Sequence, residues 1–541
     1  MDNNFYQRIE NLFKNRQFET IRFEFDLLSE REKKNPYIHN ILGIIEADNN
    51  NYIDAKNNFY YALELDEYYL PSLINLSKIS YVERDFQNII LLLKKYYKKN
   101  QQNTQVILSL ADLSFSAGFI EDSIYFHKKL IESKNFKSKD LAALIFLLNY
   151  SIDYSENEYK KYCELYNQIL EKNKIEYNLI INQHDPTKIG FISSDLRNHS
   201  VGYFLKDFIQ NLKQKNIKPI AFNLFKDNKN DPLVPELKKS FHEWFDVSDL
   251  NDKDLSDFIY SKKIYYLIDL AGYSHGNRLQ VFKNKPAPVQ LSWLGYCNNT
   301  NIKEIDFMIA DQNVISVVGA SNEAQIIKLP KIWNVLSKLN YVKINELPFT
   351  NQKKFNFGCF NNFLKISDET IEVWGDILSQ FTNSNLILKN SVTADKNFKK
   401  YFIKKLNKKI DEDRIMILDY EKNKKDHLEQ YLNIDLSLDT FPYNGVTTTF
   451  ESLWMGVPVI TLKGDRFISR CGYSINKNAG LLDFIAINKY DYVHKAISFQ
   501  DDQEIKKLSD LRKSLRLKVM SSPLFDINDY SNQFIKHLTK S

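Results

Sequence analysis

The sequence predicts an α-solenoid of tetratricopeptide-like repeats followed by two doubly wound α/β domains with a cleft between them. Three observations predict this fold. Similar residues recur every 34 positions early in the chain, short apolar runs alternate with amphipathic segments after residue 186, and a polar segment divides that alternation into two groups. At about 150 residues per domain, a chain of 541 residues has room for three or four structural units.

The first 140 residues carry the repeat. Its clearest copy places small residues where paired helices approach closely and aromatic residues one turn away, at Gly43, Tyr52, Ala55 and Phe59. The equivalent positions are Ile9, Phe18, Ile21 and Phe25, then Ser77, Phe86, Ile89 and Leu93, then Ala111, Ile120, Ser123 and His127. This spacing predicts about four tetratricopeptide repeats; the alternative is an irregular helical bundle in register by chance. The concave face of such a solenoid usually holds peptide or protein, so we expect a protein partner there.

Residues 141–185 are predicted to form a helical linker. Tyr162, Leu165 and Ile169 lie on one apolar stripe at helical spacing. The helical pattern ends at His184, Asp185 and Pro186, because proline disfavours helix at and before its own position.

Residues 186–505 are predicted to form parallel sheets covered by helices, because strand-like and helix-like segments alternate. The expected strands are 189–192, 265–270, 289–291, 307–310, 355–360, 386–388, 415–418 and 457–462. A polar stretch at 338–353 separates a first half, 186–345, from a second half, 346–505, and residues 506–541 should add C-terminal helices. Ligands of doubly wound sheets bind beyond the carboxyl ends of the strands, so we expect the chemistry in the cleft.

The composition excludes several classes of protein. The longest purely apolar run, 141–148, is far shorter than the roughly 20 residues that cross a bilayer, so no membrane span is expected. The acidic N-terminus lacks the basic and apolar regions of a signal peptide, and we expect a cytoplasmic protein. The net charge of +5 arises from interleaved charges and gives no argument for nucleic-acid binding.

The cysteines argue against a disulfide framework and a zinc site, because none forms a CxxC pair. They are Cys163, Cys297, Cys359 and Cys471.

Two polar clusters follow predicted strands of the first half. Residues 193–199 end in His199, whose imidazole could act as a general base or could merely cap the next helix, expected at about 203–212. Residues 269–278 place glycines around His275, where a structural turn is as plausible as a site.

Two further clusters follow strands of the second half. Residues 361–365 end in Lys365, whose ammonium near a helix start suits a phosphate, although a solvated loop lysine is the alternative. Gly445 and the threonines after it place N–H and hydroxyl donors at a helix N-terminus, which suits a diphosphate, and Glu451 could accept from ribose hydroxyls. Neither a Walker motif nor a clear GxGxxG is present, so a nucleotide sugar fits better than ATP or a dinucleotide.

These clusters carry a resemblance to a known family. Segments 189–199, 269–282, 286–296, 360–366 and 438–458 closely resemble the catalytic region of the O-linked N-acetylglucosamine transferases and their SPINDLY-type relatives. Those proteins join tetratricopeptide repeats to a GT-B core of two Rossmann-like domains. The resemblance implies the same architecture and a glycosyltransferase activity for this chain.

The resemblance also implies roles for particular residues. His199 matches the histidine proposed as the catalytic base, Lys365 matches the lysine at the donor diphosphate, and Thr447 and Thr448 match diphosphate-binding threonines. Lys424 and His427 resemble the lysine and histidine that hold the nucleobase and the sugar nucleotide. Asn362 stands where the family has a glutamine, and Glu451 stands where it has an aspartate that binds ribose. Val446 stands where the N-acetylglucosamine enzymes have a histidine that packs on the nucleotide.

The mechanism implied is a metal-independent, inverting transfer of a sugar to a protein Ser or Thr hydroxyl, with UDP-N-acetylglucosamine as the favoured donor and no cofactor. His199 is the first candidate for the base, His275 the second, and a donor phosphate oxygen the third. Other donors (GDP-fucose, UDP-glucose), an asparagine or small-molecule acceptor, and an adaptor that binds without turnover remain alternatives.

Overall fold

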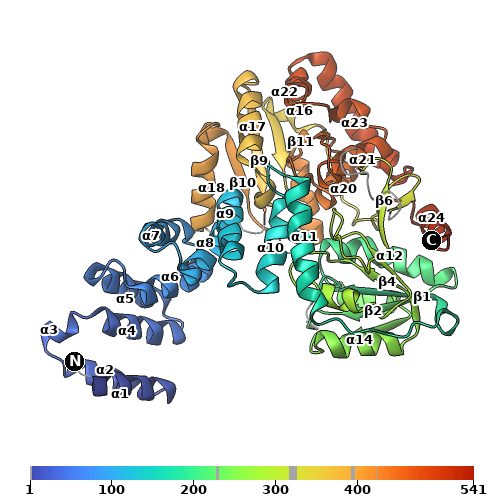
Figure 1. The fold of residues 1–541 in the computed structure, drawn as a ribbon. Coiled ribbons are helices and arrows are strands. Elements are labelled where there is room, and N and C mark those ends of the chain that lie inside the picture. Colours follow the sequence, from blue (N-terminus) through green and yellow to red (C-terminus); the bar gives the residue numbers. More distant parts are fainter. Residues whose placement is uncertain (1–2, 227–230, 316–325, 391–395, 422, 541) are drawn as a thin grey trace. The chain divides into compact units, whose positions relative to one another are not determined.

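The computed structural model describes residues 3–226, 231–315, 326–390, 396–421 and 423–540 (Figure 1). The helical repeats form one compact unit, and the chain from Lys137 onward, apart from a short segment near residue 395, forms another.

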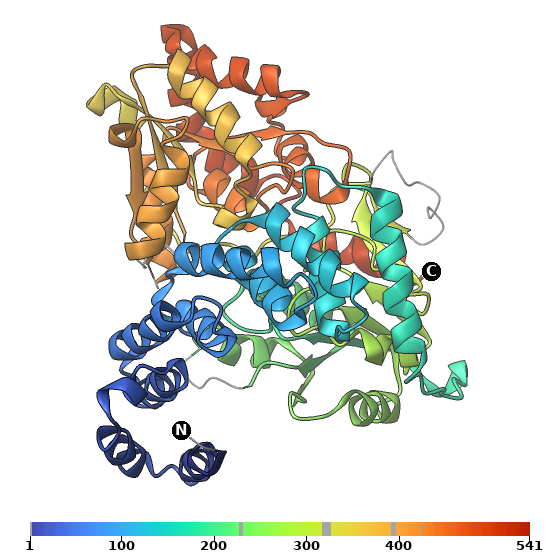
Figure 2. The same cartoon turned by 60° about the vertical axis from the view of Figure 1, so that its left-hand side comes forward.

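The repeat unit consists of nine helices in its described part, and successive helices stack side by side (Figures 1 and 2). They are α1 (Asn3–Lys14), α2 (Phe18–Asp26), α3 (Glu30–Lys33), α4 (Pro36–Asp48), α5 (Tyr52–Leu65), α6 (Leu70–Glu83), α7 (Phe86–Lys99), α8 (Thr104–Ser116) and α9 (Ile120–Glu132). Helices α2, α5, α7 and α9 begin at residues 18, 52, 86 and 120, which are 34 apart. The predicted repeat is therefore confirmed.

Buried side chains explain why the repeat has this period. The side chain at the position of Phe59 is buried in every copy, and in the last copy His127 takes this place and satisfies its Nδ1 with the Ser123 carbonyl at 2.9 Å. Gly43 allows α4 to lie against α5, because a Cβ at Gly43 would stand 2.6 Å from the Phe59 ring. Small and large residues thus alternate where paired helices meet.

The predicted linker forms two helices, α10 (Ser138–Leu148) and α11 (Glu156–Glu171), which pack on the first α/β half. Asn149, just after α10, donates to the Tyr296 hydroxyl at 2.9 Å. Tyr159 on α11 donates to the Asn299 carbonyl at 2.6 Å. Hydrogen bonds between buried groups therefore fix this helix pair to the sheet domain.

The first half contains a parallel sheet of seven strands in the order β3-β2-β1-β4-β5-β6-β7. The strands are β1 (Asp185–Ser193), β2 (Lys218–Asn223), β3 (Glu243–Asp246), β4 (Ile264–Asp269), β5 (Val289–Ser292), β6 (Phe307–Asp311) and β7 (Ile326–Leu329). The helices are α12 (Ser200–Gln214), α13 (Val234–Ser240), α14 (Asp252–Ser261) and α15 (Leu279–Asn284). All four strands predicted here are present, whereas the sequence pattern missed β2, β3 and β7.

The second half contains a parallel sheet of six strands in the order β10-β9-β8-β11-β12-β13. The strands are β8 (Phe355–Cys359), β9 (Ser384–Lys389), β10 (Ile415–Leu418), β11 (Leu436–Leu438), β12 (Val459–Leu462) and β13 (Ile485–Ala486). The helices are α16 (Pro348–Gln352), α17 (Asp368–Gln380), α18 (Lys396–Leu406), α19 (Lys424–Glu429), α20 (Thr447–Trp454), α21 (Cys471–Asn478) and α22 (Lys489–Ile497).

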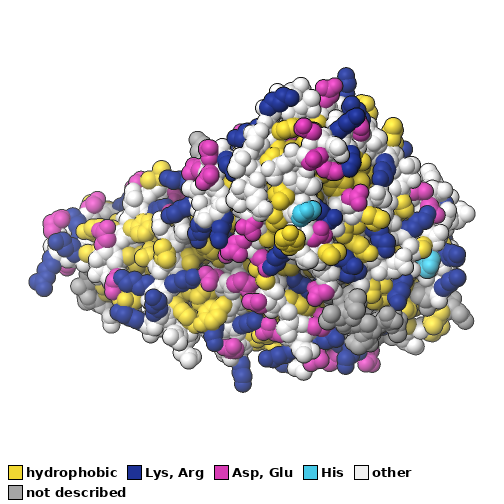
Figure 3. Space-filling model, turned by 90° about the horizontal axis from the view of Figure 1, so that it is seen from above, with side chains coloured by type: hydrophobic (Ala, Val, Ile, Leu, Met, Phe, Trp, Pro, Cys, Tyr) yellow, Lys and Arg dark blue, Asp and Glu magenta, His cyan; other side chains and the backbone are white. Residues whose placement is uncertain are grey.

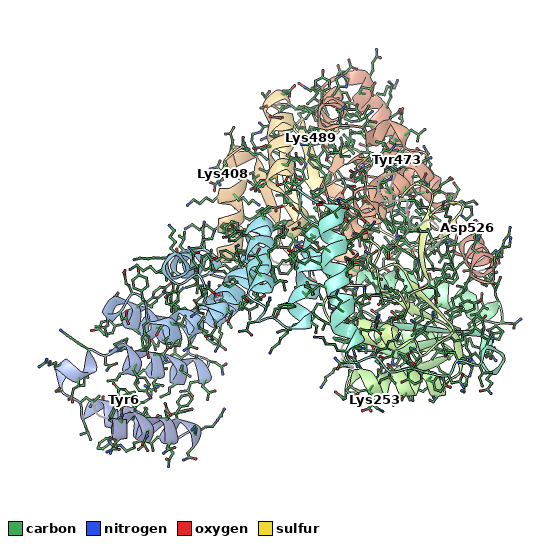
Figure 4. The ribbon with its side chains drawn as sticks, viewed as in Figure 1. Tyr6, Lys253, Lys408, Tyr473, Lys489 and Asp526 are labelled. Atoms are coloured by element: carbon green, nitrogen blue, oxygen red, sulfur yellow. The ribbon has the colours of Figure 1, made fainter. Side chains whose placement is uncertain are left out.

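The last two helices join the halves. Helix α23 (Asp502–Met520) packs on α20, and its Arg512 donates to the Ile434 carbonyl at 2.8 Å. Helix α24 (Ile527–Leu538), capped by the Asp526 carboxylate labelled in Figure 4, returns to α12 of the first half, where the Phe208 and Phe534 rings lie 5.0 Å apart. The chain therefore crosses back to the first half after completing the second.

The surface carries charges of both signs. On the face shown in Figure 3, Lys and Arg side chains are interspersed with Asp and Glu side chains. Among the helices of the described residues, none has the length and apolar character needed to traverse a membrane.

Candidate active site

The four polar clusters all lie at the carboxyl ends of strands. In the first sheet β1 and β4 are neighbours, so the loops that contain His199 and His275 run side by side, and the Ser194 hydroxyl donates to the His275 carbonyl at 3.4 Å. In the second sheet β8 and β11 are neighbours, which brings residues 361–365 against residues 439–448. The parallel topology thus gathers the residues of the site.

The N-terminus of α20 forms a cradle of hydrogen-bonded groups with Asn361 and Asp439. The Thr448 hydroxyl donates to Asn361 Oδ1, and the Asn361 amide donates to Asp439 Oδ1 at 3.1 Å. The Gly445 N–H donates to the same Asp439 oxygen at 2.7 Å. A Cβ at Gly445 would stand 2.6 Å from both Asn361 Oδ1 and Thr448 Oγ1, so only glycine lets these groups meet. Thr447 is the first residue of α20, where free N–H groups and the helix dipole favour an anion.

Lys365 borders this cradle. Its Nζ donates to the Asn444 carbonyl at 2.9 Å and lies 3.9 Å from the centre of the Tyr443 ring. Burial lowers the pKa of Lys365, partly offset by the charge of Asp439. The ammonium is thereby fixed beside the first residues of α20 before any ligand arrives.

Asp439 holds the cradle in place by accepting hydrogen bonds from its members, a role that the sequence pattern did not predict. Its carboxylate also accepts from Thr461 Oγ1 at 2.7 Å, and the side chain is buried. Burial raises the pKa of Asp439 to about 6, although hydrogen bonds from Gly445 and Thr461 oppose the shift. The sequence also gave no individual role to Asn361, because the family resemblance pointed to its neighbour Asn362 as the donor-binding residue.

Glu451 contacts other residues that were predicted to bind the donor. Lys424 pairs with its Oε1, and His427 Nε2 and the Tyr431 hydroxyl lie 2.9 Å and 3.3 Å from its Oε2. Burial alone would raise the pKa of Glu451, but the charge of Lys424 and the hydrogen bonds from His427 and Lys424 hold it well below its usual range. The structure therefore brings together three residues that the sequence analysis placed at the nucleotide.

Two predicted donor-side residues have a less direct place. Asn362 is exposed, and its Oδ1 accepts from the Leu364 N–H at 3.1 Å, which caps the short helix Phe363–Lys365. Val446, the residue just before α20, is half-buried and packs on the hydrophobic core.

His199 caps α12, which is the alternative to a general base that the sequence analysis gave for this residue. Its Nδ1 accepts from the Val201 N–H at 3.3 Å and lies 3.7 Å from Asp195 Oδ1. Burial lowers the pKa of His199 against the charge of Asp195, so the ring is neutral near pH 7. His275 lies in the next loop and is exposed.

The first turn of α12 faces the donor-side residues. Lys424 Nζ lies 4.8 Å from the centre of the Tyr203 ring, and the Phe204 and Phe450 rings are 5.4 Å apart. Because His199 caps the helix that carries Tyr203 and Phe204, the loop of His199 leads into a helix that contacts Lys424 and Phe450.

A family model for glycosyl transferase family 41 matches residues 154–330 and 346–534, which include every site residue named above. The chain belongs to glycosyl transferase family 41. Membership in family 41 confirms the resemblance stated from the sequence motifs.

Two relatives each match a little under two thirds of the chain. A probable UDP-N-acetylglucosamine–peptide N-acetylglucosaminyltransferase SPINDLY from Solanum lycopersicum is 32% identical over 350 residues, which are 63% of this chain and 37% of that protein. A probable UDP-N-acetylglucosamine–peptide N-acetylglucosaminyltransferase SEC from Arabidopsis thaliana is 28% identical over 366 residues, 65% of this chain and 36% of that protein. The chain spans little more than a third of the length of these relatives.

A solved structure of an O-GlcNAc transferase mutant from Thermobaculum terrenum has a TM-score of 0.75 at 22% identity, and the match covers 95% of this chain and 99% of that one. This similarity confirms the predicted fold class, helical repeats followed by a GT-B core.

Proposed function

We propose that this family 41 chain is an inverting, metal-independent glycosyltransferase that moves N-acetylglucosamine from UDP-N-acetylglucosamine to Ser or Thr hydroxyls of a protein. The observation that carries the proposal is the cradle at α20, which holds Thr448 and the first N–H groups of the helix, together with the Lys365 ammonium that the Asn444 carbonyl holds just before this helix. These groups suit a diphosphate leaving group.

The positive and hydrogen-bond-donating groups at the cradle support departure of the nucleoside diphosphate without a metal. As the bond between the anomeric carbon and the diphosphate breaks, negative charge grows on the phosphate oxygens. Lys365, Thr447, Thr448 and the α20 dipole lie where they can offset it, and each such donor is typically worth about 3 kcal/mol in the transition state.

The acceptor hydroxyl must lose a proton, and His199 is the first candidate to take it. The Val201 N–H donates to Nδ1, so a neutral ring in this position carries its proton on Nε2. To accept a proton at Nε2, His199 must shift to the other tautomer and direct Nδ1–H toward Asp195, now 3.7 Å away. His275 and a donor phosphate oxygen are the second and third candidates.

The names of the two relatives support UDP-N-acetylglucosamine as donor. Valine at 446 leaves GDP-fucose and UDP-glucose as alternatives, because no ring is present there to pack on the base. We propose that the acceptor is a protein bound along the repeats, as solenoids of this kind bind peptides on their concave face. An asparagine acceptor is the alternative.

The test is release of nucleoside diphosphate from a panel of UDP- and GDP-sugars, with and without EDTA and with cell extract as acceptor. We expect one donor to be turned over in EDTA and Lys365→Ala to slow turnover at least about a hundredfold. His199→Asn, which keeps a capping side chain, should retain stability but lose rate. Binding of nucleotide without turnover of any donor would instead favour an adaptor.

A further inference from the structure

Lys389 is a buried lysine beside the donor site that neither the sequence motifs nor the proposed mechanism uses. It is the last residue of β9, its side chain is 2% exposed, and its Nζ lies 3.1 Å from His427 Nδ1. The Phe360 ring lies 5.8 Å from the same nitrogen. A buried ammonium requires a polar partner, because burying a charge costs several kcal/mol unless it is paired.

The contacts form a chain that ends at Glu451. An ammonium has only donors, so Lys389 donates to Nδ1 of His427, and the neutral imidazole must then carry its proton on Nε2. That Nε2 lies 2.9 Å from Glu451 Oε2 and donates to it. Lys389 therefore selects the tautomer of His427 that can hold the Glu451 carboxylate.

We propose that Lys389 is a positioning residue of the donor site: through His427 it orients the Glu451 carboxylate to receive the ribose of a nucleotide sugar. This inference rests on the proposed function, in which Glu451 binds the donor. Without the ammonium, His427 could donate from Nδ1 and present a bare Nε2 to Glu451, which would repel the carboxylate and turn it away from the ribose.

The ionisable groups around Lys389 come from three elements. They are Glu451 on α20, Lys424, Asp426 and His427 on α19, and Glu421 after β10. Burial lowers the pKa of Lys389 to about 8, although the charges of Glu421 and Glu451 oppose the shift. The ammonium is therefore present at neutral pH and is lost in mildly alkaline solution, and donor affinity should fall with it.

The experiment measures binding of UDP and GDP by calorimetry, and KM and kcat for the donor, on the full chain. Lys389→Met removes the charge and keeps the length of the side chain, whereas Lys389→Arg keeps the charge. The control is Lys253→Met, on an exposed turn of α14 (Figure 4). His427→Asn and the double variant complete a cycle that measures whether Lys389 acts through His427.

We expect Lys389→Met to raise Kd and the donor KM about tenfold with kcat reduced much less, because a charge-assisted hydrogen bond is lost. His427→Asn should add little to this loss. The wild-type Kd should rise from about pH 7 to about pH 9, and the rise should be absent in Lys389→Met and Lys389→Arg. Lys389→Arg should recover affinity at neutral pH.

Two results separate this inference from the proposed function. A wild-type chain that neither binds a nucleotide nor turns over a sugar nucleotide overturns both. A wild-type chain that turns over its donor while Lys389→Met keeps the wild-type KM and pH profile, or while the losses from Lys389 and His427 simply add, overturns the role of Lys389 alone. Thermal unfolding of each variant shows whether lost affinity reflects lost folding.

Discussion

The ring of Tyr150 packs against the ring of Tyr443, with their centres 4.7 Å apart, and the Lys365 ammonium lies 3.9 Å from the centre of that same Tyr443 ring. Tyr150 belongs to the segment between α10 and α11, which precedes the first sheet. The segment that joins the two helices after the repeats therefore supports the ring on which Lys365 lies.

Tyr150→Leu should weaken donor binding through Tyr443, on whose ring Tyr150 packs. Loss of the ring pair, worth about 1 kcal/mol, frees Tyr443 and with it Lys365. We expect the donor KM to rise several-fold, while Tyr150→Phe, which keeps the ring, should behave as wild type. Steady-state kinetics of the three proteins decide this, and equal KM values in all three would refute it.

Gly445→Ala should abolish the cradle. The added Cβ would stand 2.6 Å from Asn361 Oδ1 and Thr448 Oγ1, so one of them must move. We expect nucleotide affinity to fall by about tenfold or more, since a buried hydrogen bond is broken. Gly118→Ala is the matched control: it is strained by its φ of +77° but meets nothing within 4 Å. Calorimetry should show weaker UDP binding only for Gly445→Ala.

Asp439 should set the acid limit of activity. Its pKa of about 6 in the folded chain exceeds the value of about 3.9 expected when unfolded, so the folded state binds more protons between these values. Ionisation therefore lowers stability as pH rises from about 4 to about 6, by an amount on the order of 3 kcal/mol, and leaves it constant above. Activity should run the opposite way, because only the carboxylate accepts from Gly445, Asn361 and Thr461 together.

The measurement is the donor kcat/KM between pH 5 and 8 for the wild type and Asp439→Asn. The wild type should lose activity below about pH 6, and Asp439→Asn should be poorly active throughout with no such limb. A wild-type profile that is flat down to pH 5 would contradict this assignment.

Gly43→Ala should destabilise the repeats without affecting the donor site. The new Cβ would lie 2.6 Å from the Phe59 ring, which must tilt or push α4 away from α5. Hydrogen exchange should quicken in α4 and α5 and stay unchanged in α20. Faster exchange in α20 would show that the two compact units do not unfold independently.

The strands that the sequence predicted are short segments rich in apolar residues, such as 189–192 and 415–418. Strand β2 was not predicted. Its apolar residues are flanked by Lys218, Pro219 and Asn223, and it is a strand because β1 and β3 pair with it on either side. Of the residues in the candidate site, Lys365 and Glu451 were predicted from motifs, and Lys424 and His427 from the family resemblance. Asn361, Asp439 and Lys389 were given no role.

The sequence by itself determined the repeat period, the order of the two sheet domains and the loops at strand ends, because spacing and apolar pattern act over short distances along the chain. Only the tertiary structure decided which side chains meet: Lys389 with His427, 38 residues apart, and Asn361 with Thr448, 87 residues apart. Such pairs depend on which strands become neighbours and on how deeply each group is buried, and these properties arise only once the sheets have formed.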